Sequence, residues 1–212
     1  MTKIERQKNK TKFKTMTKKK EAPKSENNKN EFEFDVEVGK VLSLMINSLY
    51  TNKDIALREL IANASDACDK LRYEATQNAD ILQKDEELKI SIEINKDKKQ
   101  ISLTDNGIGM SKKELIDNLG TIARSGTEKF VKSLAKNKDD KKTVDLIGQF
   151  GVGFYSSFMV ADQVEVISSK FSEKTCNKWT SKGSSKFTID KASKEESIER
   201  GTKIILHLKD DA

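Results

Sequence analysis

The residues best suited to chemistry lie between positions 54 and 73, where Glu59, Asn63, Asp66 and Lys70 follow one another at intervals of four, three and four. On an α-helix this spacing places all four side chains within about a quarter of the circumference. A carboxylate there can act as a general base, and a neutral amide oxygen is a ligand that suits a hard cation. Asn is also a poor helix former in mid-helix. Taken alone, the pattern fits a binding site and a solvated charged surface equally well.

A second candidate segment, residues 105–110, has the sequence DNGIGM and follows a predicted strand. Asp105 can accept a hydrogen bond from an amine, and Ile108 and Met110 can form an apolar wall against a flat ring. Gly107 and Gly109 have no side chains, which permits a close approach to the backbone. By itself the segment also fits an ordinary glycine turn.

A third candidate segment, residues 148–155, has the sequence GQFGVGFY and leads into an apolar helix. Glycines at the start of a helix leave backbone N–H groups available to bind anionic oxygens, as in many phosphate sites. The segment has no Gly-Lys-Ser/Thr and follows no strand directly, which excludes the P-loop and the dinucleotide fingerprint. Tight helix packing is the alternative explanation.

The composition excludes several classes of protein. The 212 residues are 35% hydrophobic and 35% charged, and no apolar run approaches the length of a membrane span. One histidine and two cysteines are too few for a serine-type hydrolase, a zinc hydrolase or a disulfide framework. We expect Cys68 to be a small core residue and His207 to lie on the surface of a strand.

The positive charge is concentrated in the first residues of the chain. Residues 1–31 carry eleven Lys/Arg and four Asp/Glu, a net charge of +7, so the total of +6 leaves −1 for residues 32–212. The larger part therefore offers no electrostatic argument for binding nucleic acid. Residues 1–31 lack apolar periodicity and the apolar centre of a secretory signal, and we predict a disordered basic tail.

Apolar periodicity predicts the elements that position the candidate residues. We expect Asp54 to be the N-cap of the first candidate helix. Its apolar stripe comprises Leu57, Leu60, Ile61, Ala64, Ala67, Cys68 and Leu71. Strands are predicted over residues 32–38, 89–95, 100–105, 164–168, 179–180, 187–189 and 203–209, and further helices over 41–50, 111–118, 128–134 and 156–160. Ser111 and Glu114 fit a capping box. Residues 111–147 fit either a flexible cover with glycine hinges or an ordinary surface excursion.

Together these segments resemble one protein family over residues 32–212. The matching sequences are LRELIANASDACDKLRY (57–73), DNGIGM (105–110), NLGTIARSGT (118–127), IGQFGVGFYSSFMVAD (147–162) and RGTKIILHLK (200–209). They are similar to the N-terminal ATP-binding domain of the ninety-kilodalton heat-shock chaperones, of bacterial or organellar type, within the Bergerat-fold superfamily of ATPases. The resemblance implies an α/β two-layer sandwich, in which a twisted, mostly antiparallel sheet has helices on one face that frame an ATP pocket.

The resemblance also implies a role for each matching residue. Glu59 corresponds to the general base, and Asn63 to the Mg²⁺ ligand. Asp105 would accept a hydrogen bond from the adenine amine, with Asp66, Gly109 and Thr202 supporting that end. The other nucleotide-binding positions would be Met110, Asn118, Gly148, Gly151, Val152, Gly153 and Phe154. The ligands implied are ATP or ADP and Mg²⁺.

The function implied is ATP binding and slow hydrolysis in a chaperone that assists protein folding. The isolated domain would be a monomer and a weak ATPase, because the family draws a catalytic arginine from a middle domain and dimerises through a later one. Client proteins would be the partners, with no nucleic acid or membrane. The location would be the cytoplasm in bacteria, or a mitochondrial or other organellar matrix. The competing hypotheses are a nucleotide-binding module without hydrolysis and a DNA-directed ATPase of the same superfamily.

Overall fold

The computed structural model describes residues 30–34, 53–78, 81–82, 86–120, 153–184, 186–210 and 212. Residues 1–29, the helices predicted over 41–50 and 128–134, and Gly148, Gly151 and Val152 lie outside these ranges. The predictions made for them therefore stay predictions. Glu31, which was predicted to lie in the disordered tail, instead belongs to a strand.

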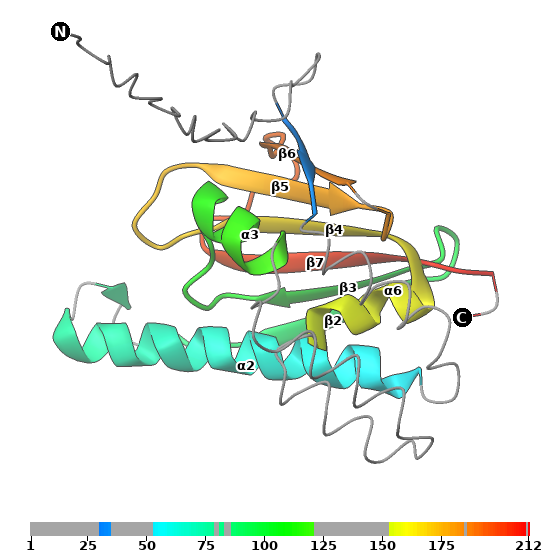
Figure 1. The fold of residues 1–212 in the computed structure, drawn as a ribbon. Helices are drawn as coiled ribbons and strands as arrows, with labels where there is room; N and C mark the ends of the chain where they lie inside the picture. The colour runs from blue at the N-terminus through cyan, green and yellow to red at the C-terminus, as the bar shows by residue number, and fades with distance from the viewer. Residues whose placement is uncertain are drawn as a thin grey trace, which may run out of the picture.

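Seven strands form one sheet, in which every pair of neighbouring strands among the described residues is antiparallel (Figure 1). Their bounds are Glu31–Glu33 (β1), Ile90–Asn95 (β2), Gln100–Asp105 (β3), Ala161–Ser169 (β4), Cys176–Ser181 (β5), Lys186–Lys191 (β6) and Gly201–Leu208 (β7). The spatial order is β1-β6-β5-β4-β7-β3-β2, so β1, which overlaps the strand predicted over residues 32–38, lies at an edge. The order also brings the ends of β3, β4 and β7 together, although they are distant in sequence.

The helices lie over one face of this sheet (Figure 1). They are α2 (Asp54–Gln77), α3 (Lys112–Leu119), the 3-10 helix η2 (Gly153–Ser156) and α6 (Ser157–Val160). Apolar side chains of α2, α3 and α6 share one core cluster with those of the sheet. The predicted two-layer arrangement is therefore confirmed. None of the helices in the described ranges is long and apolar enough to cross a membrane.

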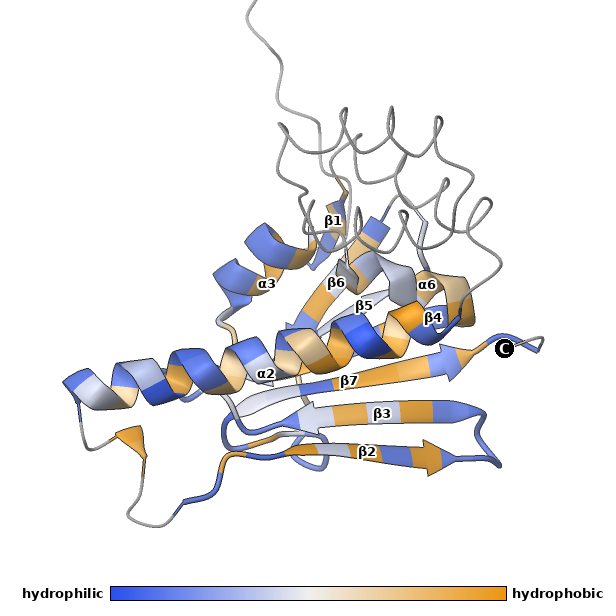
Figure 2. Cartoon of the chain, turned by 90° about the horizontal axis from the view of Figure 1, so that it is seen from below, coloured by the Kyte–Doolittle hydropathy of each residue, from blue (hydrophilic) through white to orange (hydrophobic). Residues whose placement is uncertain are grey.

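Helix α2 runs along the sheet (Figure 2), and its buried residues are all apolar. Its buried side chains are Ile55, Ala56, Leu60, Ala64, Cys68 and Leu71. Ile61, which was predicted in the apolar stripe, is instead 39% exposed. Most of the buried positions recur every four residues, so the face that contacts the core is narrower than the predicted stripe. The prediction for Asp54 was also wrong, since it is the first helical residue and the cap position, Lys53, makes no side-chain cap.

An aromatic cluster fixes the core beside the helices. Trp179 on β5 is fully buried, and its ring lies 5.6 Å from Phe154 in an edge-to-face contact. Tyr155 is also buried, and its hydroxyl donates to the backbone carbonyl of Leu119 at 3.1 Å. The cluster therefore connects η2 to the end of α3 and holds Phe154 in place.

The observed positions of Ser111, Cys68 and His207 agree with their predictions. Ser111 and Glu114 form the capping box of α3, with both reciprocal hydrogen bonds present. Cys68 is buried on α2. His207 lies on β7, where its ring nitrogen Nε2 is 3.0 Å from a carboxylate oxygen of Glu165 on β4.

Candidate functional site

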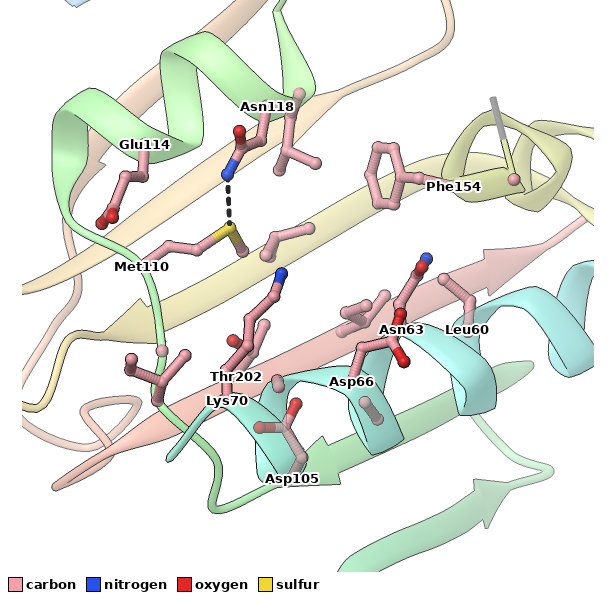
Figure 3. Close-up of a pocket in the computed structure, with 18 of the residues that line it drawn as sticks. Leu60, Asn63, Asp66, Lys70, Asp105, Met110, Glu114, Asn118, Phe154 and Thr202 are labelled. Carbon is pink, nitrogen blue, oxygen red and sulfur yellow. Dashed lines mark hydrogen bonds between the residues drawn. The ribbon is translucent and has the colours of Figure 1, made fainter. Parts of the chain in front are cut away.

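A cavity of about 400 Å³ lies between α2, α3 and the sheet. Lys70 points from α2 toward Met110, whereas Asn63 lies farther along the cavity, on the side of Phe154 (Figure 3). The lining residues are Glu59, Leu60, Asn63, Ala64, Asp66, Ala67, Lys70, Asp105, Ile108, Gly109, Met110, Glu114, Asn118, Leu119, Gly153, Phe154, Val166, Lys170, Thr202 and Ile204. A cavity of this size, lined by both apolar and polar side chains, is suited to a small molecule such as a nucleotide.

Asp105 is the buried carboxylate of the cavity, with only 4% of its surface exposed. It ends β3 directly opposite Thr202 on β7. Burial raises the pKa of its carboxyl to about 6, although hydrogen bonds from the backbone N–H groups of Gly107 and Thr202 act to lower it. The Gly107 bond is 2.9 Å long. Asp105 is thus a fixed acceptor with remaining oxygen capacity directed at the cavity.

Two glycines allow the loop after Asp105 to pass close to the sheet. Gly109 has a φ of +67°, and a Cβ there would lie 2.0 Å from the carbonyl oxygen of Ser169. Gly201 has a φ of +101°, and a Cβ there would lie 2.1 Å from the carbonyl oxygen of Asp105. Only glycine fits such conformations and contacts without strain. The predicted close approach at Gly109 is therefore real, and the group that approaches is the backbone of β4.

A serine at the end of β4 fixes the Met110 wall. The backbone N–H of Met110 donates to Ser168 Oγ at 2.8 Å. Ser168 Oγ lies 3.0 Å from the carbonyl oxygen of Gly201 and 3.0 Å from Thr202 Oγ1. One buried hydroxyl therefore joins the loop after β3 to the start of β7.

The opposite end of the cavity is formed by α2 and η2. A Cβ on Gly153 would lie 2.1 Å from Glu59 Oε2, so the glycine leaves room for this carboxylate. Partial burial raises the pKa of Glu59. Asn63 and Asp66, farther along the same face of α2, are exposed. Three polar side chains are thus presented to the cavity from one rigid helix.

The structure brings together every predicted site residue that lies within its described ranges. These are Glu59, Asn63, Asp66, Asp105, Gly109, Met110, Asn118, Gly153, Phe154 and Thr202. The sequence reasoning missed the charged lining residues Glu114 and Lys170 as site residues, and it left Lys70 without a role. Val166 and Ile204 are apolar lining residues of the cavity that the sequence reasoning also left out. The alternation of side chains along their strands could have predicted that they face the helices.

A cation site formed by protein carboxylates alone does not fit this cavity. Within the described ranges no three His, Cys, Asp or Glu residues are grouped as metal ligands. Asn63 nevertheless presents a neutral amide oxygen beside the carboxylates of α2. This fits Mg²⁺, which usually takes few ligands from the protein and the others from substrate phosphates and water.

The cavity and the antiparallel sheet are those of a nucleotide-binding domain, and comparison with known proteins identifies which one. Residues 50–206 match the family described as histidine kinase-, DNA gyrase B- and HSP90-like ATPase. The match covers well over half of the chain, and the chain therefore belongs to this family.

Bacterial chaperones are among its close relatives. The chain is 59% identical over 170 residues to "Chaperone protein HtpG" of Wolbachia pipientis wMel, covering 80% of this chain and 26% of that protein. Identity is 57% to the proteins of the same name from Anaplasma phagocytophilum and Rickettsia akari, covering 82% of this chain and 27% of each. The chain spans about a quarter of the length of these relatives.

Proposed function

We propose that this domain binds ATP and ADP and hydrolyses ATP slowly, as the nucleotide-driven part of a chaperone that assists protein folding. The family match supports the ATPase activity, and the name shared by the relatives supports the chaperone role. Since the chain spans about a quarter of those relatives, binding of client proteins is proposed for the longer protein.

The observation that carries the nucleotide proposal is the buried carboxylate of Asp105 in the same cavity as Glu59 and Asn63. Backbone N–H groups hold the Asp105 carboxylate in place. Its remaining lone pairs can accept a hydrogen bond from the exocyclic amine of adenine. Guanine carries a carbonyl at the same ring position. Two acceptors would then face each other in a buried site, which disfavours the guanine base.

At the other end of the cavity, Glu59 is the proposed general base. Its raised pKa makes the carboxylate more basic, and the absence of a side chain on Gly153 lets the carboxylate lie against the backbone of η2. Asn63 would hold Mg²⁺, which, when bound, would neutralise charge on the phosphates. Gly153 would help bind the phosphates through its backbone, together with Gly148, Gly151 and Val152.

Calorimetry of ADP and GDP binding tests this proposal. We expect ADP to bind the wild-type domain and GDP to bind at least tenfold more weakly. Asp105→Asn should lose most of the ADP affinity, because an amide can present a donor toward the adenine amine. Equal affinity for ADP and GDP, or unchanged ADP affinity in Asp105→Asn, would contradict the assigned base contact.

A DNA-directed ATPase is the second candidate, because the matching family also includes DNA gyrase B-like proteins. The net charge of −1 over residues 32–212 disfavours DNA binding. Phosphate release measured with and without duplex DNA separates the two functions, and stimulation by DNA would favour the second. If the domain were instead a nucleotide-binding module without hydrolysis, phosphate release would be the same in the wild type and in a Glu59 variant.

The assembly and location are also proposals. We infer a homodimer for the longer protein and a monomer for this domain alone, which sedimentation of both would test. We place the protein in the bacterial cytoplasm, since the relatives named above are bacterial. An organellar matrix is the alternative, and cell fractionation with antibody detection distinguishes the two.

A further inference from the structure

An ion pair outside the predicted site lines the same cavity. Lys170 lies just after β4, and its Nζ is 2.5 Å from Glu114 Oε1 on α3. The side chains are only 29% and 37% exposed. These two residues are 56 positions apart, so the pair joins the wall that carries α3 to the end of the central strand β4.

The Glu114 carboxylate also holds the first turn of α3. Its Oε2 accepts from the backbone N–H of Ser111 at 2.8 Å and from Ser111 Oγ at 2.7 Å. Burial acts to raise the pKa of Glu114, but the bonds from Lys170 and Ser111 outweigh it and the pKa is lowered. The carboxylate is therefore charged at neutral pH and shared between the helix start and Lys170.

Met110 is the residue directly before this helix start. Its backbone is bonded to Ser168, so β4 and the residues just after it hold the segment from Met110 to Glu114 at two points, through Ser168 and Lys170. Asn118 lies one turn beyond Glu114 on the same side of α3, and its Nδ2 is 3.8 Å from the sulfur of Met110. A shift of the helix start would move both Met110 and Asn118.

From this arrangement we propose that Lys170 is a positioning residue for the nucleotide. Acting through Glu114, it holds the start of α3 so that Met110 and Asn118 form a fixed wall against the bound ligand. The inference rests on the proposed nucleotide binding and adds a residue that acts without contacting the base. Preorganising a wall in this way increases affinity because less ordering remains to be done on binding.

A thermodynamic cycle with Lys170→Met and Glu114→Gln tests the inference, with ADP dissociation constants measured by calorimetry on the whole chain. We expect Lys170→Met to raise the Kd about fivefold, equivalent to about 1 kcal/mol. Lys170→Arg should restore most of the affinity, since it can donate to the same carboxylate. In a Glu114→Gln background, Lys170→Met should have less than a twofold effect, because the charged partner is gone.

The matched control is Lys113→Met, which removes a lysine from the exposed side of the same helix and should leave the Kd within twofold. Melting temperatures recorded in parallel confirm that each variant is folded at the titration temperature. An unchanged Kd in Lys170→Met, or full additivity with Glu114→Gln, would overturn the positioning role; additivity would indicate direct contact with the ligand. If Lys170→Met is unfolded, Lys170→Gln takes its place in the cycle. Absence of ADP binding by the wild type would instead refute the proposed function.

Discussion

The two ends of the cavity differ in how many of their polar groups are already hydrogen-bonded within the protein. At the Asp105 end, the carboxylate accepts from two backbone N–H groups, and Ser168 and Thr202 are hydrogen-bonded to each other beneath Met110. At the Glu59 end, the side chain of Asn63 is exposed and makes no hydrogen bond with any other residue of the described ranges. One end is preorganised and the other presents free ligands.

Under the proposed function, this difference separates recognition of the base from the chemistry at the phosphates. A buried acceptor in fixed geometry suits a group that must discriminate one base from another. Side chains without protein partners can instead bind water, a cation and phosphate oxygens, whose arrangement changes during the reaction. We therefore expect changes at the Asp105 end to alter affinity, and changes at Glu59 to alter turnover.

Replacing Glu59 by Ala is the most severe test of this comparison. Loss of a general base lowers the rate by about 10²–10⁴-fold, whereas ADP affinity should stay within about twofold. Phosphate release and ADP calorimetry on the same samples give both values. Glu74→Ala, an exposed position farther along the same helix, is the control. If Glu59→Ala hydrolyses ATP at the normal rate, the general base is elsewhere.

Replacing Asp105 by Asn tests the recognition end. We expect ADP affinity to fall about 10–100-fold, the effect of a polar mismatch of about 1–3 kcal/mol in a buried site.

The stability of the fold should not fall with the affinity. The pKa rises from 3.8 to about 6, so the ionised carboxylate costs the ligand-free fold about 3 kcal/mol at pH 7. This cost is fully present above pH 6 and is relieved as the pH falls toward 3.8.

Asn carries no such cost, and its Oδ1 can still accept from the N–H groups of Gly107 and Thr202. The melting temperature of Asp105→Asn at pH 7 should therefore match or exceed that of the wild type. A lower melting temperature together with weaker binding would indicate that Asp105 acts mainly through the fold rather than through the base.

Acidification should weaken binding without any substitution. Adenosine is the appropriate ligand, since phosphate groups titrate in the same pH range. The proposed base contact needs ionised Asp105, whose pKa is about 6. The affinity should therefore fall about tenfold from pH 7 to pH 5, with little change from pH 7 to pH 8. Affinity that does not vary between pH 5 and pH 7 would exclude Asp105 as the titrating contact.

The features that could be predicted from the sequence are those marked by a local spacing of residue types or by a short motif. Glu59, Asn63 and Asp66 were identified because helical spacing alone places them on one face. Asp105 and Gly109 were identified because a strand ends in an acidic residue followed by glycines. Both signals are local, and neither depends on the tertiary structure.

The missed features are long-range. No local pattern pairs Lys170 with Glu114, since only the meeting of β4 with α3 brings them together. The exposure of Ile61 likewise depends on how wide a stripe of α2 the sheet covers. The need for glycine at Gly201 arises from a carbonyl oxygen nearly a hundred residues earlier in the chain.

The smallest effect is expected from removing residues 1–29, which make up most of the segment 1–31 that was predicted to have no apolar face to bury. A chain that starts at Asn30 should keep its ADP affinity, and its melting temperature should stay within about 1 °C. Thermal unfolding of the shortened and complete chains measures this difference. A marked drop would mean that part of this segment docks on the domain.

A chain that starts at Phe34 gives the matched comparison, because it removes four further residues and the strand β1 with them. The ring of Phe32 stacks on that of Phe187 at 5.4 Å, and Asn30 donates from its side chain to Asp190 at 2.7 Å. Loss of these contacts should cost about 1–2 kcal/mol, which lowers the melting temperature by about 3–6 °C. ADP affinity should still be retained, because β1 lies at the edge of the sheet and contributes no residue to the cavity. If affinity fell together with the melting temperature, the edge strand and the site would be coupled. The properties of the cavity would then depend on β1 as well as on its two ends.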